Sequence, residues 1–387
     1  MKNQCGFSLV GLMVGIFVGL LVALAVLGTA SFMEAQRRTA GGANTALSSA
    51  ASGMFVLDKA VRQAGLGMMV PGGFACPALN LAYNGSVRAD AATVYPASIV
   101  DGGAGSDQLT LAYLDTLLAA APPRLLLPQS SPDAGFRIAS MDGIAAGKLL
   151  LLQDASALQP CTLMQASTVT PMSVGADIAH AGGPFNTSGA SFAIPVRYLD
   201  NSKAAPANAF RWLTYRVNTT PASPNYLSLE ELDNVTGSVT VIAEDVVSMQ
   251  AQYGIVAPGG GVLSWTDAAD NSALAPPDNV NWLAPGAADM LRVRALRIAI
   301  VAKSQDADAT SANACDAGAP NRSATQYRYL IAWTGRPPTA DPLAADPAAD
   351  GPTIDLAAAA GPKWCHFRYR TVSLMLPLLN VRMGARQ

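Results

Sequence analysis

The chain has 387 residues, of which half are apolar and 13% are charged, and its formal net charge is −2. This composition excludes an intrinsically disordered chain and a nucleic-acid-binding polyelectrolyte, because such chains combine high net charge with few apolar residues. The two histidines, His180 and His366, are far apart, which excludes a multi-histidine metal site within one chain.

The first predicted element is a long apolar helix. No charged residue lies between Lys2 and Glu34, and residues 7–33 form one apolar run. At about 1.5 Å per residue, a helix over this run is longer than the ~30 Å hydrocarbon core of a bilayer. A cleaved secretory signal has an apolar stretch of only about 7–15 residues before its small-residue cleavage site. The small residues near Ala30 keep this alternative open, but the length favours a retained membrane helix.

An amphipathic segment continues the helix. Apolar residues recur at helical spacing at Leu47, Ala50, Met54, Leu57, Val61, Ala64 and Met68. This spacing predicts one apolar stripe, which we expect to pack on the protein's own head domain rather than on a partner helix. Gly28 and the pair Gly41–Gly42 predict kinks, because each glycine costs up to ~1 kcal/mol of helix stability. The sequence Pro71-Gly72-Gly73 predicts that the helix, which begins near Phe7, ends at about Met68.

Short runs typical of strands follow residue 73, separated by clusters of Gly, Pro, Asn and Asp. The predicted strands are 108–114, 148–153, 211–217, 226–232, 238–243, 246–256, 292–303, 327–334 and 367–376. In the run 246–254, the polar residues Ser248, Gln250 and Gln252 lie on one face. Segments 258–285, 305–325 and 336–362 are rich in Ala, Asp, Pro and Gly and predict long surface loops. These patterns indicate a β-rich head.

The N-terminus carries a recognisable motif. Lys2, followed by Gly6-Phe7-Ser8-Leu9-Val10 ahead of a long apolar helix, resembles the class III leader of type IV prepilins. In that family a membrane peptidase cleaves after the glycine of a short hydrophilic leader, and the new N-terminal Phe is methylated. The resemblance implies cleavage between Gly6 and Phe7 and methylation of Phe7. It also implies that the apolar helix is retained and used for assembly.

One position departs from the family pattern. The fifth residue after the cleavage site is normally Glu, and here it is Gly11. A carboxylate within a bilayer is costly and therefore usually functional. In pilins it is thought to pair with the N-terminal ammonium group of a neighbouring subunit. Gly11 indicates either tolerated drift in a low-abundance subunit or a subunit that does not dock beneath another one.

The rest of the chain resembles PilW-type minor pilins. The similar segments, in the family's order, are 147–152 with Cys161, 244–254, 293–301 and 369–382. The resemblance implies an α+β fold in which a long N-terminal helix, half of it transmembrane, packs on a β-rich pilin-like head. The implied division is a leader at 1–6, a transmembrane half at 7–33, a periplasmic amphipathic half at 34–69 and a β-rich periplasmic head at 70–387.

The same resemblance implies a structural role. The chain has no GxSxG, GxxxxGK[ST] or HExxH motif, so no enzymatic activity, cofactor or metal is expected. The expected function is to prime type IV pilus assembly, with incorporation at the pilus tip. The expected partners are other minor pilins, the major pilin, the prepilin peptidase and the inner membrane, but no nucleic acid. The expected location is the inner membrane, with the head in the periplasm, and then the assembled pilus on the cell surface. A minor pseudopilin of a type II secretion system, and a single-pass periplasmic adhesin or receptor, remain alternatives.

The cysteines predict disulfides. Cys5 leaves with the leader, so that four cysteines are exported, at Cys76, Cys161, Cys315 and Cys365. An even number in an oxidising compartment indicates two disulfides, for which three connectivities are possible. Proximity in sequence favours Cys76–Cys161 and Cys315–Cys365. The chain has no CxxC motif, so neither a zinc ribbon nor a thioredoxin-like site is indicated.

Overall fold

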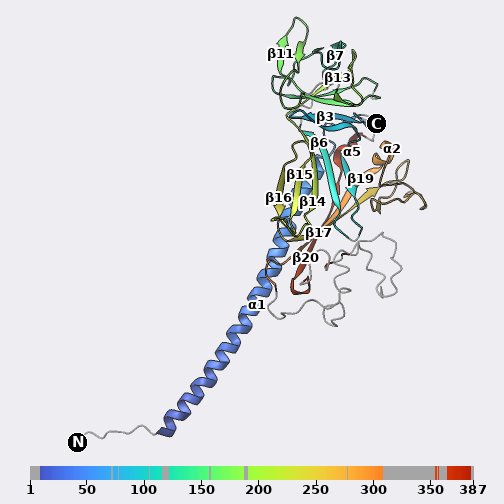
Figure 1. Ribbon diagram of the computed structural model, residues 1–387. Coiled ribbons are helices and arrows are strands. Elements are labelled where there is room, and N and C mark those ends of the chain that lie inside the picture. The colour runs from blue at the N-terminus through green and yellow to red at the C-terminus, as the bar shows by residue number, and fades with distance from the viewer. Residues whose placement is uncertain are drawn as a thin grey trace.

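The computed structural model describes residues 9–70, 73–76, 78–103, 105–115, 122–156, 158–186, 191–276, 278–307, 354, 356 and 364–384. A single long helix, α1 (Leu9–Gln63), leads from the N-terminus into a head built of several sheets (Figure 1). This arrangement confirms the predicted α+β class with an N-terminal apolar helix and a β-rich globular region.

Two antiparallel sheets form the part of the head that packs on α1. One has the order β16-β15-β14-β6-β5, and the other has the order β18-β17-β19-β20. The strands of the first are β5 (Ala97–Val100), β6 (Gln108–Asp115), β14 (Ala209–Val217), β15 (Leu229–Asp233) and β16 (Val239–Ala243). Those of the second are β17 (Val246–Ile255), β18 (Ser264–Thr266), β19 (Val293–Lys303) and β20 (Tyr369–Pro377). Helix α1 contacts strands of both sheets, among them β16, β19 and β20.

The predicted apolar stripe of α1 is buried against the protein's own head, as expected. Its buried members are Ala50, Met54, Leu57, Val61 and Ala64, which join residues of both sheets in one core. The helix comes so close to the sheets that a Cβ on Gly53 would lie 2.9 Å from a Leu229 methyl carbon. Leu47 was wrongly predicted to belong to the stripe. It is exposed, and the neighbouring Ala46 is buried in its place.

The predicted end of α1 is wrong. The helix runs without a break through Gly28 and the pair Gly41–Gly42, but it ends at Gln63 rather than near Met68. It ends early because Gly65 has a φ of +78°, a left-handed conformation that stops a helix. The backbone N–H of Gly65 then donates to the carbonyl oxygen of Ala112 in β6, at 2.9 Å.

A residue near the C-terminus caps α1. Helix α5 (Leu379–Gly384) places Asn380 beside the last turn of α1. The Asn380 side-chain nitrogen lies 3.3, 3.3 and 3.0 Å from the carbonyl oxygens of Arg62, Gln63 and Ala64. The amide therefore satisfies carbonyl acceptors at the end of the helix, of which the Gln63 oxygen also accepts from the Leu66 N–H at 2.9 Å.

Replacing Asn380 by alanine should therefore lower the free energy of unfolding by about 1–2 kcal/mol, the usual cost of losing a side-chain cap or hydrogen bond. Asn380→Asp should cost at least as much despite its matched shape, because it brings a negative charge to the negative end of the helix dipole. Urea unfolding of the detergent-solubilised protein measures both effects. Wild-type stability of Asn380→Ala would show that the cap is dispensable.

Most predicted strands are present. The segments 108–114, 148–153, 211–217, 238–243, 246–256, 292–303 and 367–376 match described strands to within about two residues at each end, and 226–232 begins three residues later, at Leu229. The predicted strand 327–334 lies outside the described residues. Every residue of β17 is buried, including its polar face. That face is hydrogen-bonded: Gln250 donates to the Gly105 carbonyl oxygen at 2.6 Å and Gln252 to the Asp267 carboxylate at 2.8 Å.

A second layer of structure is inserted between β6 and β14. These two strands pair directly, with Asp115 opposite Ala209, so residues 116–208 leave and re-enter the head at one place. The insertion contributes to a five-stranded sheet, β13-β9-β10-β3-β4, and forms a four-stranded sheet, β11-β12-β8-β7. Their bounds are β3 (Leu79–Tyr83), β4 (Ser86–Ala92), β7 (Leu125–Leu127), β8 (Phe136–Ile138), β9 (Leu149–Gln153), β10 (Cys161–Gln165), β11 (Thr168–Pro171), β12 (Ala176–Ala179) and β13 (Lys203–Ala207).

The insertion lies at the end of the molecule opposite the N-terminus of α1 (Figure 1). It has its own apolar core, which includes Phe136, Ile138, Leu150 and Tyr198. A disulfide between Cys76 and Cys161 joins β10 of this layer to the chain that follows α1, with the two Cα atoms 5.5 Å apart. This is the pairing that proximity favoured. The other predicted pair cannot be placed, because Cys315 and the side chain of Cys365 lie outside the described part of the chain.

A buried carboxylate joins the two sheets that pack on α1. Asp107, directly before β6, accepts hydrogen bonds from the backbone N–H groups of Gly102 at 2.9 Å and Ala251 in β17 at 2.7 Å. Burial raises the pKa of Asp107 to about 7, against the opposing effect of these two hydrogen bonds, and the nearby charges of Asp101 and Asp267 raise it further.

The raised pKa predicts a pH-dependent contribution to stability. The folded state binds this proton more tightly than the unfolded state, whose Asp pKa is about 3.9, so the contribution is complete below about pH 4 and lost as pH rises through about 7. The melting temperature of wild type relative to Asp107→Asn should therefore fall between pH 4 and pH 7.5. A difference that is constant over this range would contradict the assignment.

Candidate assembly helix

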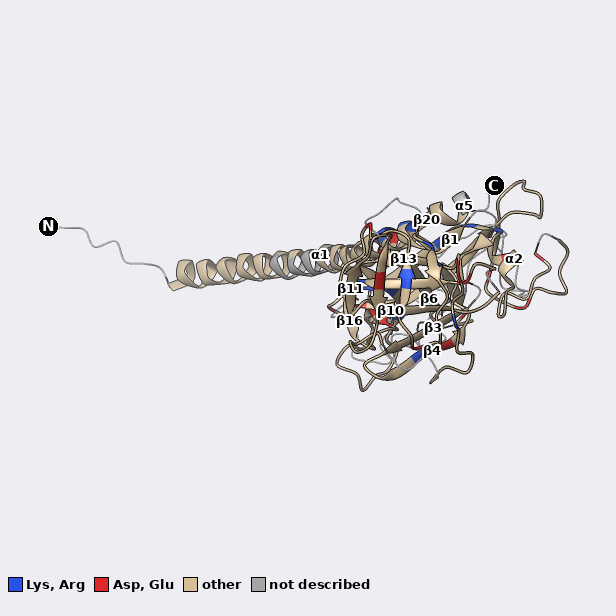
Figure 2. Ribbon diagram, turned by 90° about the horizontal axis from the view of Figure 1, so that it is seen from above, with Lys and Arg blue, Asp and Glu red and all other residues tan. Residues whose placement is uncertain are grey.

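The membrane half of α1 is exposed along its whole length. The segment Leu9–Thr29 has a mean hydropathy of 2.9, and none of it is buried by the rest of the described chain. The Lys, Arg, Asp and Glu residues coloured in Figure 2 lie on the head, and the segment Leu9–Thr29 contains no charged residue. By length and composition the segment can cross a membrane.

One side of this segment carries only small residues. Gly11, Gly15, Gly19 and Ala23 follow one another at four-residue intervals. A Cβ added at any of the three glycines would have no other atom within 4 Å. This small-xxx-small spacing allows the backbone of another membrane helix to approach closely. Sequence reasoning missed this feature, although the spacing can be read directly from residues 11–23. It also gives Gly11 a third interpretation, as a packing position.

Apolar side chains are also exposed on the second half of α1. Leu47 is 47% exposed and Phe55 is 71% exposed, with the exposed Ala51 between them at four-residue spacing. They lie on the side of α1 that faces away from the head, whereas the adjacent Met54 is 2% exposed and packs in the core. Single exposed apolar residues are ordinary, but these three share one side of the helix whose segment Leu9–Thr29 is exposed over 21 residues. Glu34, Arg37 and Arg38 lie between the two groups.

The structure places only some of the predicted site residues. Gly11 lies in α1 and is exposed, and Cys76 is bonded to Cys161. The predicted cleavage and methylation positions, Gly6 and Phe7, lie outside the described residues. Within the described ranges no group of three or more His, Cys, Asp or Glu side chains has a metal-binding arrangement.

Two family models match the chain. Residues 1–27 match the prokaryotic N-terminal methylation motif, and residues 214–335 match the type IV pilus-assembly protein W family, PilW. The chain matches a PilW-type pilin with a prepilin leader. No curated protein and no solved structure gave a significant match.

The PilW match begins within β14 and extends over β15–β19, which lie in the two sheets that pack on α1. The inserted layer at 116–208 lies outside it. The PilW match and the methylation motif support a type IV pilus-related pilin. The leader and the single apolar helix indicate a membrane-anchored, pilus-associated protein, and pilin-like families are structural proteins rather than enzymes.

Proposed function

We propose that this protein is a minor pilin that is incorporated into a type IV pilus through α1, primes pilus assembly and occupies the tip. The observation that carries the proposal is the continuity of α1. One unbroken helix has an exposed apolar half and a second half fixed in the core of the head. A methylation motif covers the start of this helix.

The mechanism follows from the two halves of the helix. Removal of leader 1–6 frees the amino group of Phe7, and residues 7–33 remain in the inner membrane with the head, residues 70–387, in the periplasm. Lipid does not drive apolar helices together, so close packing must do so, and the small residues from Gly11 to Ala23 allow it. In the fibre the same helix packs against helices of other minor pilins and of the major pilin.

The proposed position at the tip rests on Gly11. A subunit added beneath another one offers its membrane carboxylate to the ammonium group of the subunit above. The first subunit of a fibre has no subunit above it, so a carboxylate at its position 11 would be an unpaired charge in the membrane, which is costly. Its own Phe7 ammonium group is still met by the carboxylate of the next subunit.

Labelling of the head on assembled fibres tests this position. A few labels at fibre ends are expected, and deletion of the gene should lower the number of pili. Gly11→Glu should be tolerated or only mildly disruptive. Labels spread evenly along the shaft would contradict the tip position, and Gly11 would then be explained as tolerated sequence drift. Loss of protein secretion with normal pili in the deletion strain would favour a type II secretion pseudopilin, which the PilW match does not support.

Because Phe55 lies on the exposed side of α1, we expect its replacement to affect assembly but not stability. Phe55→Ser should leave the melting temperature nearly unchanged because the ring is 71% exposed, but it should lower the amount of protein in sheared fibres. The adjacent Met54→Ser is the matched control. It removes a buried side chain and should cost about 2–5 kcal/mol of stability, by analogy with Met→Ala. Wild-type incorporation of Phe55→Ser would show that this surface is not an assembly contact.

A further inference from the structure

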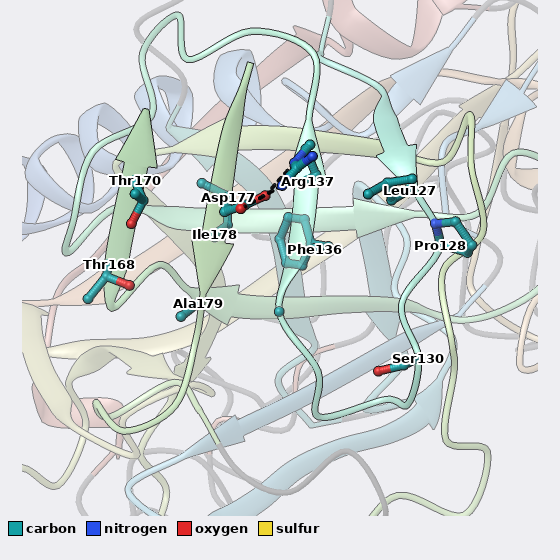
Figure 3. Close-up of a pocket in the computed structure, with 11 residues that line it drawn as sticks. Leu127, Pro128, Ser130, Phe136, Arg137, Thr168, Thr170, Asp177, Ile178 and Ala179 are labelled. Carbon is teal, nitrogen blue, oxygen red and sulfur yellow. Dashed lines mark hydrogen bonds and ion pairs between the residues drawn. The ribbon is translucent and has the colours of Figure 1, made fainter. Parts of the chain in front are cut away.

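The inserted layer presents a hollow at the end of the molecule that is farthest from the membrane helix. The hollow has a volume of about 420 Å³, within the size range of small-ligand sites, and lies on the outer face of the sheet β11-β12-β8-β7 (Figure 3). Its residues belong to neither family match. A role for this hollow is therefore separate from pilus assembly and does not depend on where the protein lies in the pilus.

Four side chains form one row across this sheet. The strand register places Thr170 opposite Asp177, Asp177 opposite Arg137, and Arg137 opposite Leu127. Neighbouring strands lie about 4.8 Å apart, so the row spans roughly 14 Å. It contains, in order, a hydroxyl, a carboxylate, a guanidinium group and an apolar side chain.

The charges in the centre of the row cancel. Arg137 donates to Asp177 through Nε at 2.6 Å and Nη2 at 2.8 Å, and this pairing lowers the pKa of the carboxyl group. Both side chains are partly exposed, at 32% and 44%. These two bonds leave Nη1 of Arg137 as a donor and further lone pairs of Asp177 as acceptors. A charged ligand would have to compete with the ion pair, whereas a neutral ligand can use both groups at once.

Hydroxyl groups and apolar atoms lie on either side of the ion pair. Thr168, Thr170 and Ser130 are exposed, and their hydroxyls have no hydrogen-bond partner among the residues that the structure describes. Leu127, which is 50% exposed, and Pro128 lie across the ion pair from Thr168 and Thr170, on the side where Ser130 also lies (Figure 3). Adjacent hydroxyls of a sugar can donate to the carboxylate and accept from the guanidinium group, while its C–H face contacts Leu127 and Pro128.

We propose that this hollow binds a neutral oligosaccharide. The row of hydroxyl, carboxylate, guanidinium and apolar groups fits a ligand that carries both donors and acceptors and no charge. The location suits a contact outside the cell, because it lies at the opposite end of the molecule from the apolar half of α1 (Figure 1).

The test is an array of neutral oligosaccharides, with sialylated and sulfated oligosaccharides as charged probes. The full-length protein is kept in a detergent without a sugar headgroup. Titration calorimetry then measures the affinity for each neutral oligosaccharide that binds. Wild type should bind at least one neutral oligosaccharide. Thr170→Val should weaken this binding about five- to tenfold, the loss expected for one neutral hydrogen bond, and Arg137→Gln should weaken it further. Thr240→Val, at an exposed position on β16, is the matched control and should bind as wild type does.

Three results would overturn the proposal: no neutral oligosaccharide binds wild type, only charged probes bind, or Thr170→Val and Arg137→Gln bind as wild type does. The melting temperatures of all variants show whether a loss of binding is a loss of folding. Counts of pili in cells that carry Thr170→Val separate this proposal from the assembly role, since those counts should not change.

Discussion

Replacing Gly6 by valine should leave the leader attached and remove the protein from the pilus. The residue before the cleaved bond must fit an extended backbone in the peptidase, and glycine does so without steric cost. With the leader retained, Lys2 and the polar residues after it stay joined to the apolar helix, and the ammonium group of Phe7 never forms. We expect no detectable cleaved form and at least a tenfold loss from fibres.

Gel mobility in membrane fractions and counts of pili measure this effect. Gln4→Val is the matched control, because it adds bulk within the same leader two residues from the cleavage site. It should be cleaved as wild type is. Normal cleavage of Gly6→Val would place the cleavage site elsewhere and would remove the main support for a prepilin-type leader.

Loss of the Cys76–Cys161 disulfide should produce the largest change in stability. The two cysteines are 85 residues apart in sequence, and the chain-entropy model gives about 4–5 kcal/mol for a loop of this size. Both side chains are buried, and Cys161 pairs with the chain that follows α1 at the base of the inserted layer. Without this bond, only the strands β6 and β14 and non-covalent contacts hold the layer to the rest of the head.

The double variant Cys76→Ser, Cys161→Ser avoids an unpaired thiol and is the appropriate test. Its melting temperature should fall by several degrees, and proteolysis should begin within residues 116–208 before it reaches the sheets that pack on α1. Cys5→Ser is the control, because the proposed cleavage removes this residue with the leader. Equal melting temperatures of the double variant and wild type would show that non-covalent packing alone fixes the layer.

Local sequence patterns predicted many of the helices and strands. The elements that they did not predict depend on contacts between residues far apart in the sequence. The membrane helix and the long strands, such as β17 and β19, have apolar runs that can be read from a few adjacent residues. Strand β4 contains three alanines, and its one larger apolar residue, Val87, is exposed, so it has no such pattern. The parallel pairing of β10 with β3 joins residues about 80 positions apart, and no local signal predicts it.

The end of α1 and one of the candidate sites also depend on long-range contacts that local sequence does not predict. The cap on α1 comes from Asn380, more than 300 residues away, so the sequence near Gln63 does not reveal it. Leu47 fits the heptad spacing, but it lies on the side of α1 that faces away from the head, and Ala46 packs in its place. The row from Thr170 to Leu127 exists only through the register of four strands, whereas the glycine spacing in α1 was open to inspection.

The central claim is that the protein is a cleaved pilin held in the fibre by its N-terminal helix. Mass spectrometry of the N-terminal peptide from sheared, purified pili tests it most directly. The account predicts a chain that begins at N-methylated Phe7 and retains the whole apolar segment Leu9–Thr29. A chain that begins near Ala30 or Ser31, or the absence of the protein from purified pili, would contradict it and indicate a protein exported by a cleaved signal.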